Sequence, residues 1–357
     1  MSTFSRLYRA ETEYDFVGGR KRWFAISMAL IAISLLGFLV RGLNLNVDFE
    51  GGVTVQVNNE TNISVADMRE ELTGIGLADA RIEFLDSLDG SSAFRVRTQA
   101  LDPALESEFV RTVAAAAGVS IDETDLESVG PTFGAEITRR AVQALVVFLI
   151  VAALFISWRF EWKMAMAGLT ALFHDLTITF GVYAVVGFEV TPATIVAVLT
   201  ILGYSLYDTV VVFDKVNENV ETWSDKHTYT EVVNKAMNEV LMRSINTSLT
   251  SLLPVGSLLF VGSYLLGAST LREFALALFV GIAAGTYSSI FVASPLLAVW
   301  KEKEDYWHHH RRRLEGRRDA KIAKTSSTTR GSVPQTSRPP ASGGATPRPP
   351  KKKRKKR

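Results

Sequence analysis

The sequence predicts a polytopic α-helical membrane protein with six transmembrane helices and an external α+β domain of ferredoxin-like arrangement between helices 1 and 2. Runs of about 18 or more mainly apolar residues are typical of membrane-spanning helices, and six such runs occur in the 357 residues. A mixed polar stretch of about 90 residues separates the first two runs, which is long enough for a small domain. Together these observations predict a helical bundle that carries one folded external domain.

The apolar runs define the expected helices. Trp23, Trp158, Trp162 and Trp300 lie at their ends, where indole rings favour the headgroup layer. Pro254 should kink the fifth helix. Residues 41–44 lack the small-residue pattern of a signal-peptidase site, so the first run is predicted to be a retained anchor. The six runs are residues 23–40, 141–158, 164–187, 190–213, 245–261 and 274–300.

The net charge of +2 conceals two oppositely charged segments. Residues 44–135 contain 5 Arg and 17 Asp or Glu, and residues 301–357 contain 19 Lys or Arg and 5 Asp or Glu. Short loops rich in Lys and Arg face the cytoplasm, and such residues cluster before the first run, between the second and third, and between the fourth and fifth. The chain is therefore expected in the cell (plasma) membrane with both termini cytoplasmic and the acidic loop outside.

This orientation divides the chain into five expected parts. They are a cytoplasmic N-terminus (1–22), the first transmembrane helix (23–43), the extracytoplasmic α+β domain (44–135), transmembrane helices 2–6 (136–300) and a basic disordered cytoplasmic tail (301–357).

The external domain mixes strand and helix patterns. Residues 53–57 alternate as in a half-buried strand, Ser64 caps a helix through residue 72, and the Asp89-Gly90 turn joins strands 81–85 and 93–98. Asp102 and Pro103 open a helix through residue 117 as its cap and first position, and a strand follows at residues 125–129. This order is β-α-β-β-α-β. The chain has no cysteine, so no disulfide can brace this domain.

The tail has two compositions. Residues 325–350 are rich in Ser, Thr, Gly and Pro and are expected to be disordered. The basic run 351–357 suits anionic lipid or RNA, or is a solvated extension. Three adjacent histidines, His308 to His310, read as polar filler beside basic residues rather than as a metal site.

Asp208 and Asp175 are carboxylates within expected spans, where a charge costs about 2.5–3.5 kcal/mol at the helix centre. Tyr204 and Ser205 share the helix face of Asp208 and can supply it with hydroxyls, and Gly203 permits close backbone approach. Asp208 is therefore predicted to carry function. For Asp175, beside His174, a hydrogen-bonded packing role and a proton-relay role stay equally open.

Polar residues also begin the fifth span. Arg243, at its start, reads from sequence alone as a side chain that reaches the headgroups. Gly281 and Gly285 in the sixth span form a small-xxx-small pair suited to close helix packing. The polar residues after Arg243 must face protein or water; they are Ser244, Asn246, Thr247, Ser248, Thr250 and Ser251.

No phosphate loop, catalytic triad, zinc-ligand spacing or dinucleotide signature occurs. Hydrolytic and redox enzymes are therefore unsupported, and no metal or cofactor is expected beyond the proton as coupling ion. A membrane machine with protonatable groups and a folded external domain is the expected class.

Several motifs, in order along the chain, resemble those of the SecF family, the smaller subunits of the SecDF accessory complex of bacterial protein export. The resemblance covers about residues 20 to 300. The motifs are Asp48-Phe49-Glu50-Gly51-Gly52, Val129-Gly130-Pro131, His174-Asp175, the run from Gly203 to Asp214, and Arg243-Ser244-Ile245-Asn246-Thr247-Ser248.

The resemblance implies pairing with SecD in a twelve-span assembly of the RND superfamily beside the SecYEG channel. In that family, proton-motive force drives external domains that help a preprotein outward after SecA has pushed it in, and YajC-like proteins are further expected partners. Carried over, Asp208 is the proton-relay carboxylate, Arg243 its basic partner and Asp175 a less secure member, with Tyr204, Ser205, Asn246 and Thr247 as support. Asp48, Gly51 and Gly52 form the family motif after the first helix.

Two alternatives stay open. One is an RND-type exporter of lipids or small molecules, although such exporters usually carry both six-helix halves in one chain. The other is a non-energised translocon scaffold in which Asp208 only packs.

Overall fold

The computed structural model describes residues 13–86, 92–265 and 269–330. Within these residues, six helices are long and apolar enough to cross a membrane, as predicted. They are α2 (Arg20–Arg41), α6 (Pro131–Arg159), α7 (Trp162–Val186), α8 (Pro192–Trp223), α9 (Tyr229–Ser257), which a π-helix η2 (Leu258–Leu265) continues, and a last span of α10 (Ser269–Ser288), the π-helix η3 (Ser289–Ala293) and α11 (Ser294–Glu302).

Three helices run past the apolar segments that predicted them. α6 begins at Pro131, ten residues before the apolar run and inside the stretch assigned to the external domain, and α9 begins sixteen residues early, at Tyr229. α8 continues to Trp223, ten residues beyond its run. Hydropathy marks only the lipid-facing length, whereas Pro131 at the first helical position and the Thr228 capping box set the true starts.

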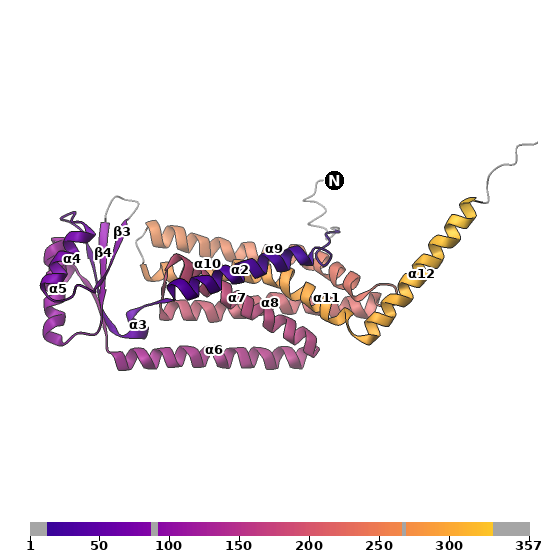
Figure 1. Cartoon of the computed structure of the whole chain (residues 1–357), viewed down its shortest axis with the longest axis horizontal. Helices are drawn as coiled ribbons and strands as arrows, with labels where there is room; N and C mark the ends of the chain where they lie inside the picture. The colour runs from indigo at the N-terminus through magenta and orange to yellow at the C-terminus, as the bar shows by residue number, and fades with distance from the viewer. Residues whose placement is uncertain (1–12, 87–91, 266–268, 331–357) are drawn as a thin grey trace, which may run out of the picture. The chain divides into compact units, whose positions relative to one another are not determined.

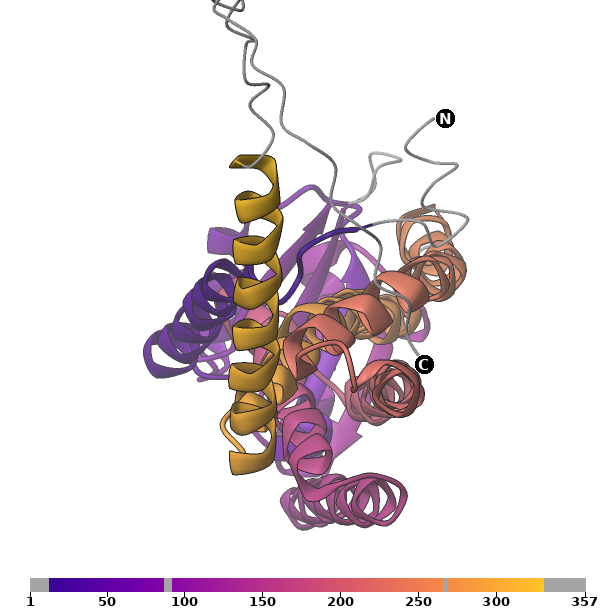
Figure 2. The same cartoon turned by 90° about the vertical axis from the view of Figure 1, so that its right-hand side faces the viewer.

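The bundle has a central group of helices and two peripheral ones. In α2 and in α6 only 11% of the apolar window is buried in the protein, against 61% in the last span. α6 lies at the edge of the bundle in two perpendicular views (Figures 1 and 2), and α2 lies at its edge in Figure 2. α7, α8 and α10 therefore form the core in which a polar group can be shielded from lipid.

The domain between α2 and α6, which is predicted to be external, contains one antiparallel sheet. Its strands are β2 (Gly52–Asn58), β3 (Arg81–Asp86), β4 (Ser92–Thr98) and β5 (Asp125–Val129), in the order β3-β4-β2-β5. Helices α4 (Val65–Gly74) and α5 (Pro103–Ala117) cover the sheet face turned away from the membrane helices (Figure 1). Alternation along the strands buries Val53, Val55 and Val57 of β2 and Phe94 and Val96 of β4 beneath these helices.

The element order within this domain is the predicted one, with differences in detail. The Ser64 hydroxyl accepts a hydrogen bond from the Asp67 backbone N–H, and the Asp67 carboxylate accepts one from the Ser64 backbone N–H. The predicted cap is therefore a complete capping box. Asp102 is the N-cap residue of α5 and Pro103 its first helical position, as predicted, but the Asp102 side chain makes no cap hydrogen bond. The predicted Asp89-Gly90 turn lies outside the described residues.

The family motif after α2 forms the connection into the sheet. β1 (Asn44–Leu45) pairs in parallel with β6 (Glu189–Val190), and the short α3 (Val47–Glu50) follows. Gly51 has φ +77°, and a β-carbon there would lie 2.7 Å from Pro131 Cα. Glycine is needed because the chain must turn and pass close to the start of α6.

The predicted disorder of the tail is wrong for its described part. α12 (Asp305–Arg330) is helical and includes residues 325–330. Arg and Lys are strong helix formers, and Arg311 forms an ion pair with Glu315 one turn later. The prediction from overall composition did not take these two helix-stabilising effects into account. The basic run 351–357 lies outside the described residues.

Glycines in α10 bring it against α8, as predicted. A β-carbon on Gly285 would lie 2.9 Å from Ser205 Cβ, and one on Gly281 would lie 2.7 Å from Ile201 Cγ1. Gly203 differs, because a β-carbon there would meet nothing within 4 Å. The prediction that Gly203 permits close backbone approach is therefore wrong.

Gly281→Leu should lower the melting temperature of the detergent-solubilised protein, because overpacking of a tight contact costs about 1–3 kcal/mol. Gly203→Ala is the matched control and should melt no lower than the parent, since Ala favours a helix over Gly by about 0.5–1 kcal/mol. Thermal unfolding followed by tryptophan fluorescence measures both, and equal melting of the two variants would contradict the packing role of Gly281.

Candidate functional site

Asp175 of α7 lies at the centre of a buried polar network. Its side chain is fully buried, and Oδ2 accepts hydrogen bonds from Ser205 Oγ at 2.5 Å and Ser288 Oγ at 2.8 Å. His174 Nδ1 lies 3.1 Å from Oδ1. Because Ser205 belongs to α8 and Ser288 to α10, one carboxylate joins the three core helices.

His174 extends this network toward α2. Its ring stacks on Tyr287 at 5.9 Å between centroids, and the Tyr287 hydroxyl donates to the Trp23 carbonyl at 3.0 Å. Ser27 Oγ of α2 donates to the same hydroxyl at 3.2 Å. His174 Nε2 is buried without a hydrogen-bond partner among the described residues, so one ring nitrogen stays available.

Asp208 of α8 is buried but less completely bonded. Ser244 Oγ of α9 donates to its Oδ1 at 2.9 Å, and Oδ2 has no hydrogen-bond partner in the described part of the chain. Ser289 faces the same carboxyl group, but its hydroxyl is engaged by Thr209 at 2.9 Å and by the Gly285 carbonyl at 2.9 Å. An unpartnered buried carboxylate oxygen is costly when charged, so Asp208 has a position at which a proton can bind.

Two consecutive serines at the junction of α10 and the π-helix η3 serve different parts of the polar site. Ser288 and Ser289 are consecutive, yet the first bonds Asp175 and the second bonds Thr209 beside Asp208. Insertion of a π turn shifts the side-chain register of a helix, and such turns are frequent at functional sites. The hydroxyl oxygens of Ser248 and Thr286 lie 2.7 Å apart and extend the polar layer between α9 and the last span.

Arg243, which the resemblance implies to be the basic partner of Asp208, does not pair with it in this structure. Among the described residues no ion pair within 4.0 Å joins them, and Arg243 Nη2 instead donates to the Tyr207 hydroxyl at 2.9 Å. Successive helix positions are about 100° apart. Tyr207 and Arg243 each precede a buried residue, Asp208 and Ser244, and so both point off the buried face.

Arg243 lines an open cavity of about 910 Å³ together with charged residues of the α6–α7 connection and of α8. Arg159 and Asp214 form an ion pair of 2.7 Å on its wall. Asp214 therefore lies on the wall of a polar cavity that reaches Arg243.

The remaining predicted residues divide between the network and the surface. Ser205 bonds Asp175 rather than Asp208, the Tyr204 hydroxyl is buried without a partner among the described residues, and Thr247 bonds the Arg243 carbonyl. Asn246 is exposed. In the polar run of α9, Ser244 and Ser248 are buried, while Asn246 and Thr250 are exposed. Only part of that run therefore faces protein within this chain.

The sequence reasoning missed Thr209, Thr286, Ser288 and Ser289. The run Thr286-Tyr287-Ser288-Ser289 inside an apolar span was the available signal. Asp48 of the family motif lies outside this network, where it accepts from Asn46 Nδ2 at 3.3 Å. Within the described residues, no three His, Asp or Glu side chains gather as metal ligands.

The sequence of this chain matches those of known proteins over most of its length. Residues 98–303 match the family model "Protein export membrane protein SecD/SecF, C-terminal". The protein translocase subunit SecF of Streptomyces coelicolor is 40% identical over 90% of this chain and 86% of its own length. The SecF of Mycobacterium tuberculosis H37Rv is 40% identical over 85% and 71%, respectively.

Solved structures agree in fold. The crystal structure of SecDF, a translocon-associated membrane protein from Thermus thermophilus, has a TM-score of 0.73 at 34% identity and covers 82% of this chain. A SecDF structure in a super-membrane-facing form has a TM-score of 0.58 at 34% identity over 88% of this chain. This chain spans 39% and 40% of those two chains. The extent of these matches places the chain in the SecF family of protein-export membrane proteins.

Proposed function

We propose that this chain, together with a SecD subunit, uses the proton-motive force to assist the late, SecA-independent stage of preprotein translocation through SecYEG. SecD is the first expected partner because the Thermus relative is a SecDF protein of which this chain spans 40%. SecA, the channel, YajC-like proteins and the preprotein follow from the family resemblance. The observation that carries the proposal is the buried Asp208 with its unpartnered oxygen.

The proposed cycle involves two arrangements of α8 and α9. In the present one Arg243 is held by Tyr207, next to Asp208 in sequence, and Asp208 is held by Ser244, next to Arg243. A small rotation between these helices would exchange the partners and bring Arg243 to a charged Asp208. Protonation would remove that attraction and favour the present arrangement.

Two further points support a moving assembly. The two SecDF structures give TM-scores of 0.73 and 0.58 at the same identity, so similar sequences adopt different arrangements. One proton crossing about 100 mV releases about 2.3 kcal/mol. That energy can bias a two-state domain, and repeated cycles would be needed to move a polypeptide.

The proposal includes the topology. The β2-α4-β3-β4-α5-β5 order and the sheet order support a ferredoxin-like domain. The Lys and Arg residues of the short loops on the opposite side support its external location. Both termini would be cytoplasmic, and the basic tail would meet anionic lipid or RNA there.

Asp208→Asn should remove the uncoupler-sensitive part of preprotein translocation into inverted membrane vesicles that contain this chain and SecD. The amide cannot carry the proton, while its size keeps the complex assembled. Asp214→Asn is the matched control on the same helix and should retain most of that part, since Asp214 is exposed at the rim. Equal uncoupler sensitivity of Asp208→Asn and the parent would favour the scaffold function instead.

Asp175→Leu should destabilise the protein more than Asp208→Leu does. The first leaves Ser205 and His174 without their shared acceptor, and the second orphans only Ser244. Each buried polar group left unsatisfied costs about 1–3 kcal/mol. Melting temperatures of the purified variants measure the difference, and an equal or larger loss for Asp208→Leu would refute the structural role given to Asp175.

A further inference from the structure

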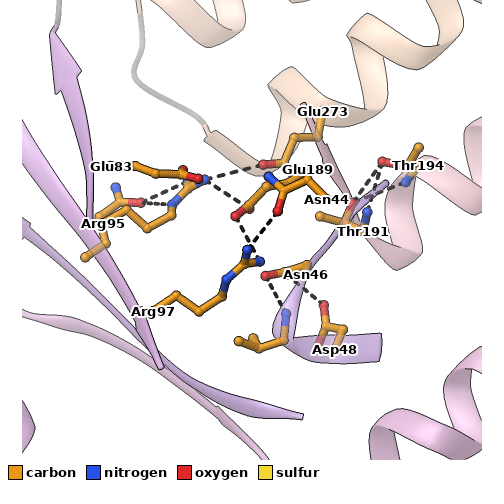
Figure 3. A network of polar contacts seen from close by, with 12 residues as sticks. Asn44, Asn46, Asp48, Glu83, Arg95, Arg97, Glu189, Thr191, Thr194 and Glu273 are labelled. Atoms are coloured by element: carbon orange, nitrogen blue, oxygen red, sulfur yellow. Dashed lines mark hydrogen bonds and ion pairs between the residues drawn. The ribbon is translucent and has the colours of Figure 1, made fainter. Parts of the chain in front are cut away.

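Two arginines, Arg95, which is buried, and Arg97, which is half-buried, lie where the free face of the external sheet meets the outer ends of the membrane helices (Figure 3). Alternation along β4 turns Phe94 and Val96 into the domain core and Arg95 and Arg97 toward the helices. The two arginine side chains are only 11% and 13% exposed. Buried charges are tolerated only with close partners, so their partners define how the sheet is attached.

Glu189 of β6 binds both arginines. Its Oε2 lies 3.3 Å from Arg95 Nη1 and its Oε1 lies 3.2 Å from Arg97 Nη1, so each carboxylate oxygen takes one guanidinium. Burial raises the pKa of Glu189 above its ordinary value, and the charge of Arg95 opposes this rise. Each arginine has a further partner: Arg95 lies 3.6 Å from Glu273 of α10, and Arg97 donates to the Leu45 carbonyl at 2.7 Å.

The two acceptor carboxylates are connected to the three helices that form the buried polar network. Glu189 lies three residues after α7 ends and three before α8 begins, and Glu273 belongs to α10. Along the same three helices, α7 carries Asp175, α8 carries Asp208 and α10 carries Ser288. A shift of any of them would therefore move a carboxylate that is bound to β4.

The covalent connections join the sheet to α2 and α6, the two peripheral helices, rather than to α7, α8 or α10. The chain enters the sheet after Gly42, at φ +71°, and Gly51, at φ +77°, and leaves it through Gly130 before α6. By contrast, each guanidinium is a planar fork whose hydrogen bonds fix direction as well as distance.

We propose that Arg95 and Arg97 are positioning residues that transmit movements of α7, α8 and α10 to the external sheet. The proposal deepens the proposed function and rests on it, because it assumes that the state of Asp208 moves these helices. A static anchor would use the same contacts but would pass on no movement.

The test measures a distance in the complex with SecD, reconstituted in lipid vesicles. The chain has no native cysteine, so Glu108→Cys on α5 and Val147→Cys on the peripheral helix α6, both at exposed positions, take a pair of spin labels. Electron paramagnetic resonance gives the distance between the two labels, which is compared between the chain that keeps Asp208 and the chain with Asp208→Asn. The joint variant is Arg95→Gln with Arg97→Gln, and Arg111→Gln, an exposed charge on α5, is the matched control.

In the control background, Asp208→Asn should shift the mean distance. In the joint variant the distribution of label-to-label distances should broaden, and Asp208→Asn should no longer shift its mean. Export driven by the proton gradient should fall by at least about fivefold, which is the lower end of usual coupling effects. If Asp208→Asn shifts the distance as much in the joint variant as in the control, the proposal that the arginines transmit movement is overturned. It is also overturned if Asp208→Asn causes no shift in the control. Export indifferent to Asp208→Asn, with the shift still lost in the joint variant, would refute the proton-coupled function alone.

If the double variant fails to assemble, Arg95→Lys with Arg97→Lys keeps the charges and removes the planar forks. It should reduce the shift relative to the Arg111→Gln control. An undiminished shift in the Lys variant would equally overturn the proposal.

Discussion

The structure depends on the need to satisfy buried carboxylates inside a lipid-facing bundle. A bilayer offers no water to polar groups, so each must find partners within the protein. Asp175 meets this need by drawing hydroxyls from α8 and α10, which requires those helices to pass closely. Gly281 and Gly285 permit that approach, and the π-helical turn after Ser288 aims two successive serines at two different sites. The packing of the core thus follows from one polar centre.

The protein satisfies buried charge in two different ways at two depths. Between the core helices, Asp175 and Asp208 are surrounded by serine and threonine hydroxyls, which can donate or accept and therefore tolerate either protonation state. At the outer ends, Glu189 and Glu273 face Arg95, a group that is always charged and only donates. The first arrangement suits a site that changes its proton, and the second suits a contact that must hold its geometry while helices move.

The sequence predicted the architecture because its signals are strong and local. Long apolar runs, alternating strands, the Ser64 cap and the paired glycines of the last span each depend on neighbouring residues. It failed where a partner comes from a distant element: Ser205 shares a helix face with Asp208 yet bonds Asp175. Helix periodicity places a residue on a face but does not say which neighbour lies opposite. The π turn, which turns Ser288 and Ser289 inward, breaks the periodicity on which such reasoning relies.

The outward face of α9 gives the strongest argument that this chain works with a second helical subunit. Arg243, Asn246 and Thr250 are exposed along this helix in the isolated chain, and Tyr207, which binds Arg243, is 54% exposed. Asn246 and Thr250 are one turn apart and so share a face. Polar groups within a spanning helix are costly toward lipid and normally face protein or a water-filled path. A partner that supplied polar groups to this face would cover it and would stand beside Asp208, so the pairing proposed with SecD would complete the site as well as the assembly.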